Sequence, residues 1–189
     1  MATVRLGKVK EKLGDKIEIN FKSFPLAIEH DPNRRFNSYT AEAWHRANLE
    51  AAEAEDAICL KPWRFNDETY PKSSMPAQIA SKCALMQGKE PFDRFHLALM
   101  KAYFEQNKDV SDTDVLLPLA RDAGLDIEKF AADLKSESLA EAVLGEYREA
   151  QTKYPGMGVP LAVFGGRYDI LGAVPIQLYW RAVDLLLEG

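Results

Sequence analysis

Hydrophobic and polar residues recur along this chain with two different periods, and each period predicts a different element. Near the N-terminus an apolar stripe at helical spacing is interrupted by charged residues, so residues 2–13 are predicted to form a helix that Gly14 ends. The next segment, "KIEINFK", alternates apolar with polar side chains, which predicts a strand over residues 17–23, ended by Pro25. The chain therefore opens with a helix followed by a strand.

The middle of the chain is predicted to be mainly helical. Thr40 is expected to cap a helix after a turn-rich loop, whereas residues 60–74 carry two prolines and are expected to be irregular. Helical spacing, capping residues and glycines that end helices predict five further helices. These helices begin at Pro76, at Pro91, after a capping box of Ser111 and Asp114, after the cap Asp126, and after a second box of Ser138 and Glu141.

The stretch "GMGVPLAVFGGRYDILGAVP", residues 156–175, predicts a hairpin. Two short apolar segments are joined by Gly165 and Gly166, which accept the positive φ angles of a tight turn. Pro175 is expected to begin the last helix. Pro160 stands at the head of the first strand, an unusual place for a residue that cannot donate a ladder hydrogen bond.

Composition and charge exclude some classes of partner. The chain has 189 residues, of which 47% are hydrophobic and 28% charged, as in a globular domain. The net charge of -5 argues against nucleic acid, whose phosphates need a basic face. No stretch approaches the length of a membrane-spanning helix, and the N-terminus lacks the apolar core of a secretory signal. We therefore expect no nucleic-acid partner, no membrane and a cytoplasmic location.

Few side chains offer catalytic or metal-binding chemistry. Cys59 and Cys83 are predicted to be buried, unpaired thiols in a reducing compartment; a disulfide or a catalytic pair are the alternatives. His30, His45 and His96 are too scattered along the chain to suggest a metal site. The sequence therefore predicts neither a catalytic residue nor a metal ligand.

The element order, together with "GVP", "VFGGRYDILGAVP" and the closing helix, resembles the thioredoxin superfamily. More narrowly, the chain resembles the FrnE-like branch of the DsbA family, which neighbours the 2-hydroxychromene-2-carboxylate isomerases and the kappa-class glutathione transferases. The resemblance implies an α/β, thioredoxin-like fold with a large helical insertion. Residues 1–25 and 155–189 would form the core, and residues 26–154 the insertion and connecting loops.

The resemblance also implies a substrate-binding site. Pro160 would be the family's cis-proline, and Val159 before it would offer its backbone to an extended substrate; a trans proline at an ordinary strand start is the alternative. The family places C-x-x-C, after a first strand, at the start of the helix over residues 2–13. This sequence begins at Met1 without that strand or a cysteine there, so the first strand is expected to be missing.

Three functions remain open from the sequence. The first is a DsbA-like thiol–disulfide oxidoreductase scaffold whose dithiol is absent from this chain. The second is a glutathione-dependent isomerase or transferase, for which glutathione would be the cofactor. The third is a non-catalytic peptide-binding protein. The expected partner is a thiol- or disulfide-bearing protein or small molecule. A homo-oligomer is also open, because a neighbouring copy could lend a strand to the exposed sheet edge.

Overall fold

The computed structural model describes residues 1–36, 59–64 and 66–188. These residues form two compact units. The sheet unit comprises Met1–Lys22 and Glu149–Gly189, and the helical unit comprises Ser23–Arg148. The helix predicted at Thr40 lies outside the described residues.

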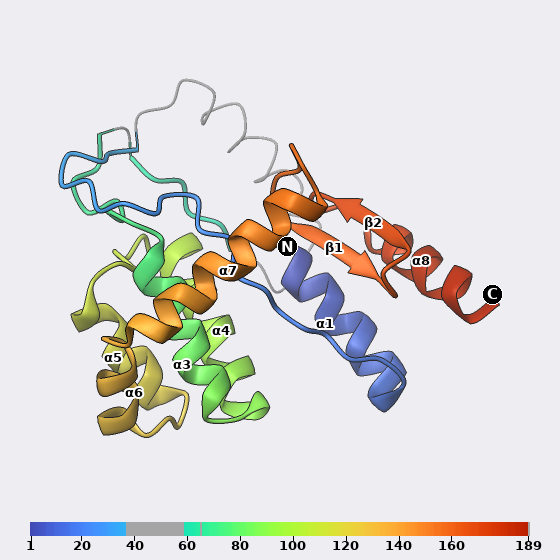
Figure 1. Cartoon of the computed structure of the whole chain (residues 1–189), viewed down its shortest axis with the longest axis horizontal. Helices are drawn as coiled ribbons and strands as arrows, with labels where there is room; N and C mark the ends of the chain where they lie inside the picture. Colours follow the sequence, from blue (N-terminus) through green and yellow to red (C-terminus); the bar gives the residue numbers. More distant parts are fainter. Residues whose placement is uncertain (37–58, 65, 189) are drawn as a thin grey trace. The chain divides into compact units, whose positions relative to one another are not determined.

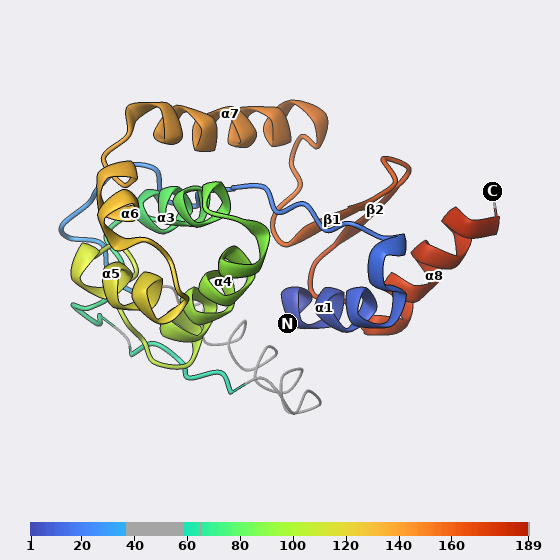
Figure 2. The same cartoon turned by 90° about the horizontal axis from the view of Figure 1, so that it is seen from below.

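The sheet unit joins the two ends of the chain around one small core (Figures 1 and 2). Its elements are α1 (Ala2–Leu13), the short 3-10 helix η1 (Gly14–Lys16), β1 (Leu161–Phe164), β2 (Tyr168–Leu171) and α8 (Ile176–Glu188). Val9, Tyr179 and Val183 form the buried centre, which places α1 against α8. The predicted helix over residues 2–13 is confirmed, and Gly14 follows it with a positive φ of 56°.

The hairpin packs one of its two faces on this core. β1 and β2 are antiparallel, with Ala162 opposite Ile170 and Phe164 opposite Tyr168. Ala162, Phe164 and Ile170 pack against the buried centre, as the period of two in strands requires. The turn between the strands places Gly165 and Gly166 at positive φ, as predicted.

The strand predicted over residues 17–23 is wrong. Ile17 has extended backbone angles, and burial alternates along the segment as the sequence pattern suggested. However, the sheet of the described residues contains only β1 and β2, so this segment runs beside no strand partner. Alternating side chains predict which residues face inward, whereas a strand also needs a neighbouring backbone to bond.

The helical unit packs its helices around an apolar interior. The elements are α3 (Met75–Met86), α4 (Lys89–Phe104), α5 (Thr113–Asp122), α6 (Ile127–Asp133) and α7 (Glu137–Lys153), whose last residues belong to the sheet unit. Fully buried side chains include Ala80, Cys83, Phe95, Leu116, Phe130 and Val143. Within the described part of the chain, no helix combines the length and apolarity needed to cross a membrane.

Both predicted capping boxes are displaced from the caps that the structure shows, one toward each end of the chain. Asp112, rather than Ser111, caps α5 by accepting a hydrogen bond from the Asp114 N–H. α7 already begins at Glu137, and the Ser136 hydroxyl accepts a bond from the Leu139 N–H at 3.4 Å. A carboxylate one residue later, or a hydroxyl two residues earlier, can reach the free N–H groups at the start of a helix, so pattern matching alone selected the wrong residue. The predicted cap of α6 by Asp126 is confirmed.

Candidate functional site

The segment before β1 is the most exposed part of the sheet unit near the predicted site. Residues 155–160 are all exposed, and Val159 keeps 43% of its surface accessible although it is apolar. The Val159–Pro160 peptide bond is cis. The Pro160 carbonyl accepts a hydrogen bond of 2.8 Å from the Gly172 N–H, which extends the hairpin pairing beyond β1. Pro160 is thereby fixed on one side, while Val159 stays open to solvent.

The loop opposite Pro160 is held by hydrogen bonds from two helices. The Arg5 guanidinium of α1 donates 2.7 Å bonds to the carbonyl oxygens of Ala173 and Val174. The Tyr179 hydroxyl of α8 donates to the Gly172 carbonyl at 3.2 Å. Burial raises the pKa of Tyr179, so this hydroxyl remains a neutral donor. The first turns of α1 therefore lie beside the loop that pairs with Pro160.

Arg5 was missed as a site residue by sequence reasoning, which treated it as a charged residue on the solvent face of a helix. Arg5 is only 6% exposed, because it lies four positions before Val9 and eight before Leu13 and so shares one side of α1 with them. That spacing was visible in the sequence. The carbonyl groups that satisfy the buried guanidinium were not, since they lie almost the whole chain length away.

The two cysteines differ, contrary to the sequence prediction. Cys83 is buried in α3, and burial, together with the Asp133 carboxylate, raises the pKa of its thiol to about 12. Cys59 is exposed, so its predicted burial is wrong: it precedes an irregular segment instead of a packed helix face. Both thiols are unpaired, and neither belongs to the sheet unit. Cys83 cannot supply a thiolate at neutral pH.

The histidines do not come together either. His96 lies in α4, where burial lowers its pKa, whereas His30 is exposed and His45 lies outside the described residues. No group of three or more His, Cys, Asp or Glu side chains that could hold a metal occurs in the part of the chain described by the structure. The candidate site is therefore the exposed Val159–Pro160 segment with its supporting loop, a surface suited to binding.

A hairpin headed by a cis-proline, with α1 and α8 packed on its inner face, is typical of a thioredoxin-like fold. A family model described as thioredoxin matches residues 5–152. The chain belongs to the thioredoxin family.

Solved structures share this fold over nearly the whole chain. A candidate protein disulfide isomerase from Nitrosomonas europaea superposes with a TM-score of 0.75 and 16% identity, covering 98% of this chain and 89% of that one. A probable DsbA oxidoreductase from Streptomyces coelicolor gives a TM-score of 0.77 and 21% identity, covering 97% and 83%. The thioredoxin-like α/β fold predicted from the sequence is confirmed.

Curated relatives carry a different description. ClpXP adapter protein SpxH of Bacillus subtilis is 26% identical over 136 residues, which cover 72% of this chain and 44% of the relative. The SpxH of Halalkalibacterium halodurans is 29% identical over 166 residues, covering 77% and 54%. The chain spans about half the length of the curated relatives it matches.

Proposed function

We propose that this chain is the substrate-docking scaffold of a FrnE-type, DsbA-like thiol–disulfide oxidoreductase. It binds an extended segment of a thiol- or disulfide-bearing protein beside Val159 and Pro160. The observation that carries this proposal is the exposed segment that leads into β1 and contains the apolar residue Val159. The edge of β1 that faces away from β2 has no strand partner among the described residues. An extended peptide can satisfy such an edge by main-chain hydrogen bonds.

The position of α1 supports the oxidoreductase part of this proposal. Its first turns lie beside the loop that pairs with Pro160, because Arg5 bonds to Ala173 and Val174. A thiol at a helix N-terminus has a lowered pKa, since the helix dipole stabilises the thiolate. A docked disulfide would therefore lie near the place where this fold can best activate a thiol. The unpaired thiols of Cys59 and Cys83 support a reducing, cytoplasmic location.

The test places a reporter thiol at this end of α1. Thr3→Cys, in a background with Cys59→Ala and Cys83→Ala, is mixed with a short peptide whose single cysteine is activated as a thionitrobenzoate disulfide. Attack by the new thiolate breaks that disulfide, forms a protein–peptide disulfide and releases coloured thionitrobenzoate. The matched control is Glu11→Cys, an exposed position near the other end of α1.

We expect Thr3→Cys to react at least about tenfold faster than Glu11→Cys, equivalent to about 1.4 kcal/mol. Val159→Asp should remove this advantage, whereas Leu26→Asp, on an exposed apolar residue of the helical unit, should keep it. Equal rates at both positions of α1 would contradict the oxidoreductase scaffold. The chain without the engineered cysteine should show little activity in an insulin-reduction assay.

A second candidate is an adapter that binds proteins without redox chemistry. It is favoured by the name of the curated relatives and by the inert, buried thiol of Cys83. In that case the peptide would bind, and Val159→Asp would weaken binding measured by fluorescence anisotropy, but the Thr3→Cys thiol would react no faster than the control.

A further inference from the structure

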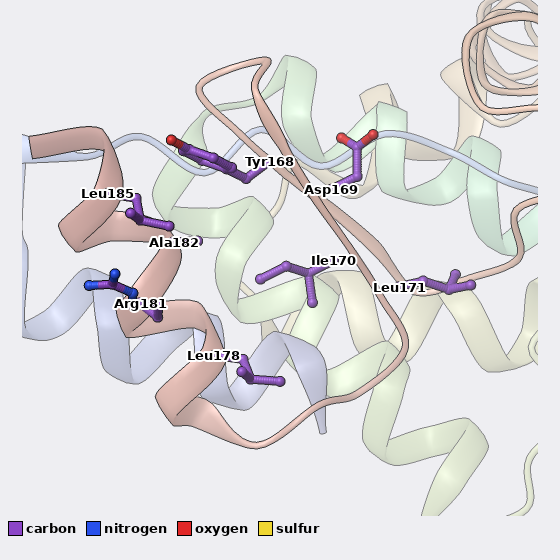
Figure 3. A pocket seen from close by; sticks show the side chains of 8 residues that line it. All are labelled: Tyr168, Asp169, Ile170, Leu171, Leu178, Arg181, Ala182 and Leu185. Carbon is purple, nitrogen blue, oxygen red and sulfur yellow. The ribbon is translucent and has the colours of Figure 1, made fainter. Parts of the chain in front are cut away.

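A hollow of about 380 Å³ opens between β2 and α8, in the sheet unit (Figure 3). One wall is β2, and the other is a single face of α8 on which the lining residues recur three or four positions apart. Leu171 and Leu178 each keep 49% of their surface exposed there. The hollow is lined by Tyr168, Asp169, Ile170, Leu171, Leu178, Arg181, Ala182 and Leu185.

The backbone of β2 offers unused hydrogen-bonding groups at the rim of this hollow. In an antiparallel pair, residues alternately direct their N–H and C=O toward and away from the partner strand. The bond from the Gly172 N–H to Pro160 fixes that alternation, so Tyr168 and Ile170 bond toward β1. Asp169 and Leu171 therefore direct theirs to the outer edge, where the described residues supply no further strand.

The side chains of an added strand would alternate in the same way. Ile170 faces the core shared with α8, so every second side chain of a strand paired with β2 would point to the α8 side. There it would meet Leu178 and Leu185, which line the hollow. The edge and the hollow thus suit one occupant, an extended segment with an apolar side chain between these two leucines.

The charge at one end of the hollow defines this occupant further. Figure 3 shows Arg181 on the side of Tyr168 and Leu185, away from Leu171. The Arg167 guanidinium lies 5.7 Å from the centre of the Tyr168 ring. Among the described residues, neither arginine has a carboxylate within ion-pair distance. An acidic side chain would complement this end.

We propose that β2 and α8 form a docking groove for an extended, acidic segment of a partner protein, separate from the Val159–Pro160 surface at the other side of the sheet. The segment adds to β2 as a strand, places an apolar side chain between Leu178 and Leu185, and brings a carboxylate to Arg181 and Arg167. A second copy of this chain fits less well. A copy that paired through its own β2 would carry Asp169 on the face away from α8, because Asp169 alternates with the core-facing Ile170, and so could not offer that carboxylate to Arg181.

The experiment uses the whole chain and two fluorescein-labelled peptides of alternating valine and threonine, one ending in two glutamates and one in two glutamines. Binding is followed by fluorescence anisotropy at low and high salt. Arg181→Glu is compared with Arg121→Glu, the same charge reversal on an exposed arginine of the helical unit. Circular dichroism checks that both variants are folded. Leu178→Asp provides a second, independent change in the groove.

We expect the glutamate peptide to bind about tenfold tighter than the glutamine peptide. Arg181→Glu and Leu178→Asp should remove most of its binding, whereas Arg121→Glu should change it less than about twofold. Added salt should weaken binding, because exposed charges are screened. Hydrogen exchange should slow at the amides of Asp169 and Leu171 when the peptide binds, since strand addition pairs these two groups.

Three results would overturn the proposal. The first is equal affinity for both peptides, and the second is binding without protection of the Asp169 and Leu171 amides. The third is self-association, seen by light scattering and abolished by Leu178→Asp, which would make a second copy the occupant. Val159→Asp should leave the protection of the Asp169 and Leu171 amides unchanged, so failure here is distinguishable from failure of the proposed substrate-docking function.

Discussion

Replacement of Gly165 by alanine should destabilise the sheet unit through two separable effects. Gly165 has a φ of +57°, and an added Cβ would lie 2.7 Å from Leu186 Cδ2 and 3.1 Å from Leu186 Cδ1. The left-handed backbone costs an alanine about 1–2 kcal/mol. Pushing the Leu186 side chain from its rotamer adds about 0.5–1.5 kcal/mol. We therefore expect Gly165→Ala to lower the free energy of unfolding by about 1.5–3.5 kcal/mol.

The neighbouring glycine provides the control. Gly166 has a φ of +67° but nothing within 4 Å of an added Cβ, so Gly166→Ala should cost only the backbone term of about 1–2 kcal/mol. In a Leu186→Ala background the cost of Gly165→Ala should fall to the same value, because the overlapping methyl groups are gone.

Urea denaturation followed by circular dichroism, with hydrogen exchange at the hairpin amides, measures these differences in the sheet unit. Equal costs for Gly165→Ala and Gly166→Ala would refute the packing argument. No cost for either would refute the backbone argument.

Arg5→Met should lower stability by about 2–4 kcal/mol, because it removes two charge-assisted bonds and leaves two carbonyls unsatisfied; Glu11→Met, exposed on the same helix, should change little in the same urea titration. At pH 8 iodoacetamide should modify Cys59 and leave Cys83 unreacted until the protein unfolds, as mass spectrometry would show. Because the folded pKa of Cys83 lies at about 12, above its ordinary 9.0, its contribution to stability should be lost as pH rises between these values. Bonds from Lys153 and Lys22 lower the pKa of Glu149 to about 2, so its contribution should be present above pH 4.5 and lost as pH falls toward 2; Glu149→Gln should remove that dependence in acid titrations. Light scattering should show a dimer or larger assembly if a neighbouring copy lends a strand to β1, and a monomer at micromolar concentration would contradict it.

The helices and the hairpin could be predicted because their signals are local. Each signal involves residues close together in sequence: the apolar stripe of α1 with its period of 3.6 residues, the cap Asp126, and the glycine pair of the hairpin turn. Neighbouring residues therefore determine these elements. The exposed Val159–Pro160 segment was likewise found from a proline that an ordinary strand would avoid.

Other features depended on residues distant in sequence. Residues 17–23 have the alternation of a strand, but strand formation needs a second backbone, which a periodic pattern does not specify. Cys59 and Cys83 look alike in sequence, and only the packing of α3 buries one of them. Arg5 is charged, yet tertiary structure buries it because the carbonyls of Ala173 and Val174 take the place of water. The sequence by itself thus determined the elements and the exposed segment, whereas the tertiary structure decided which polar groups are buried and which sheet edges stay open.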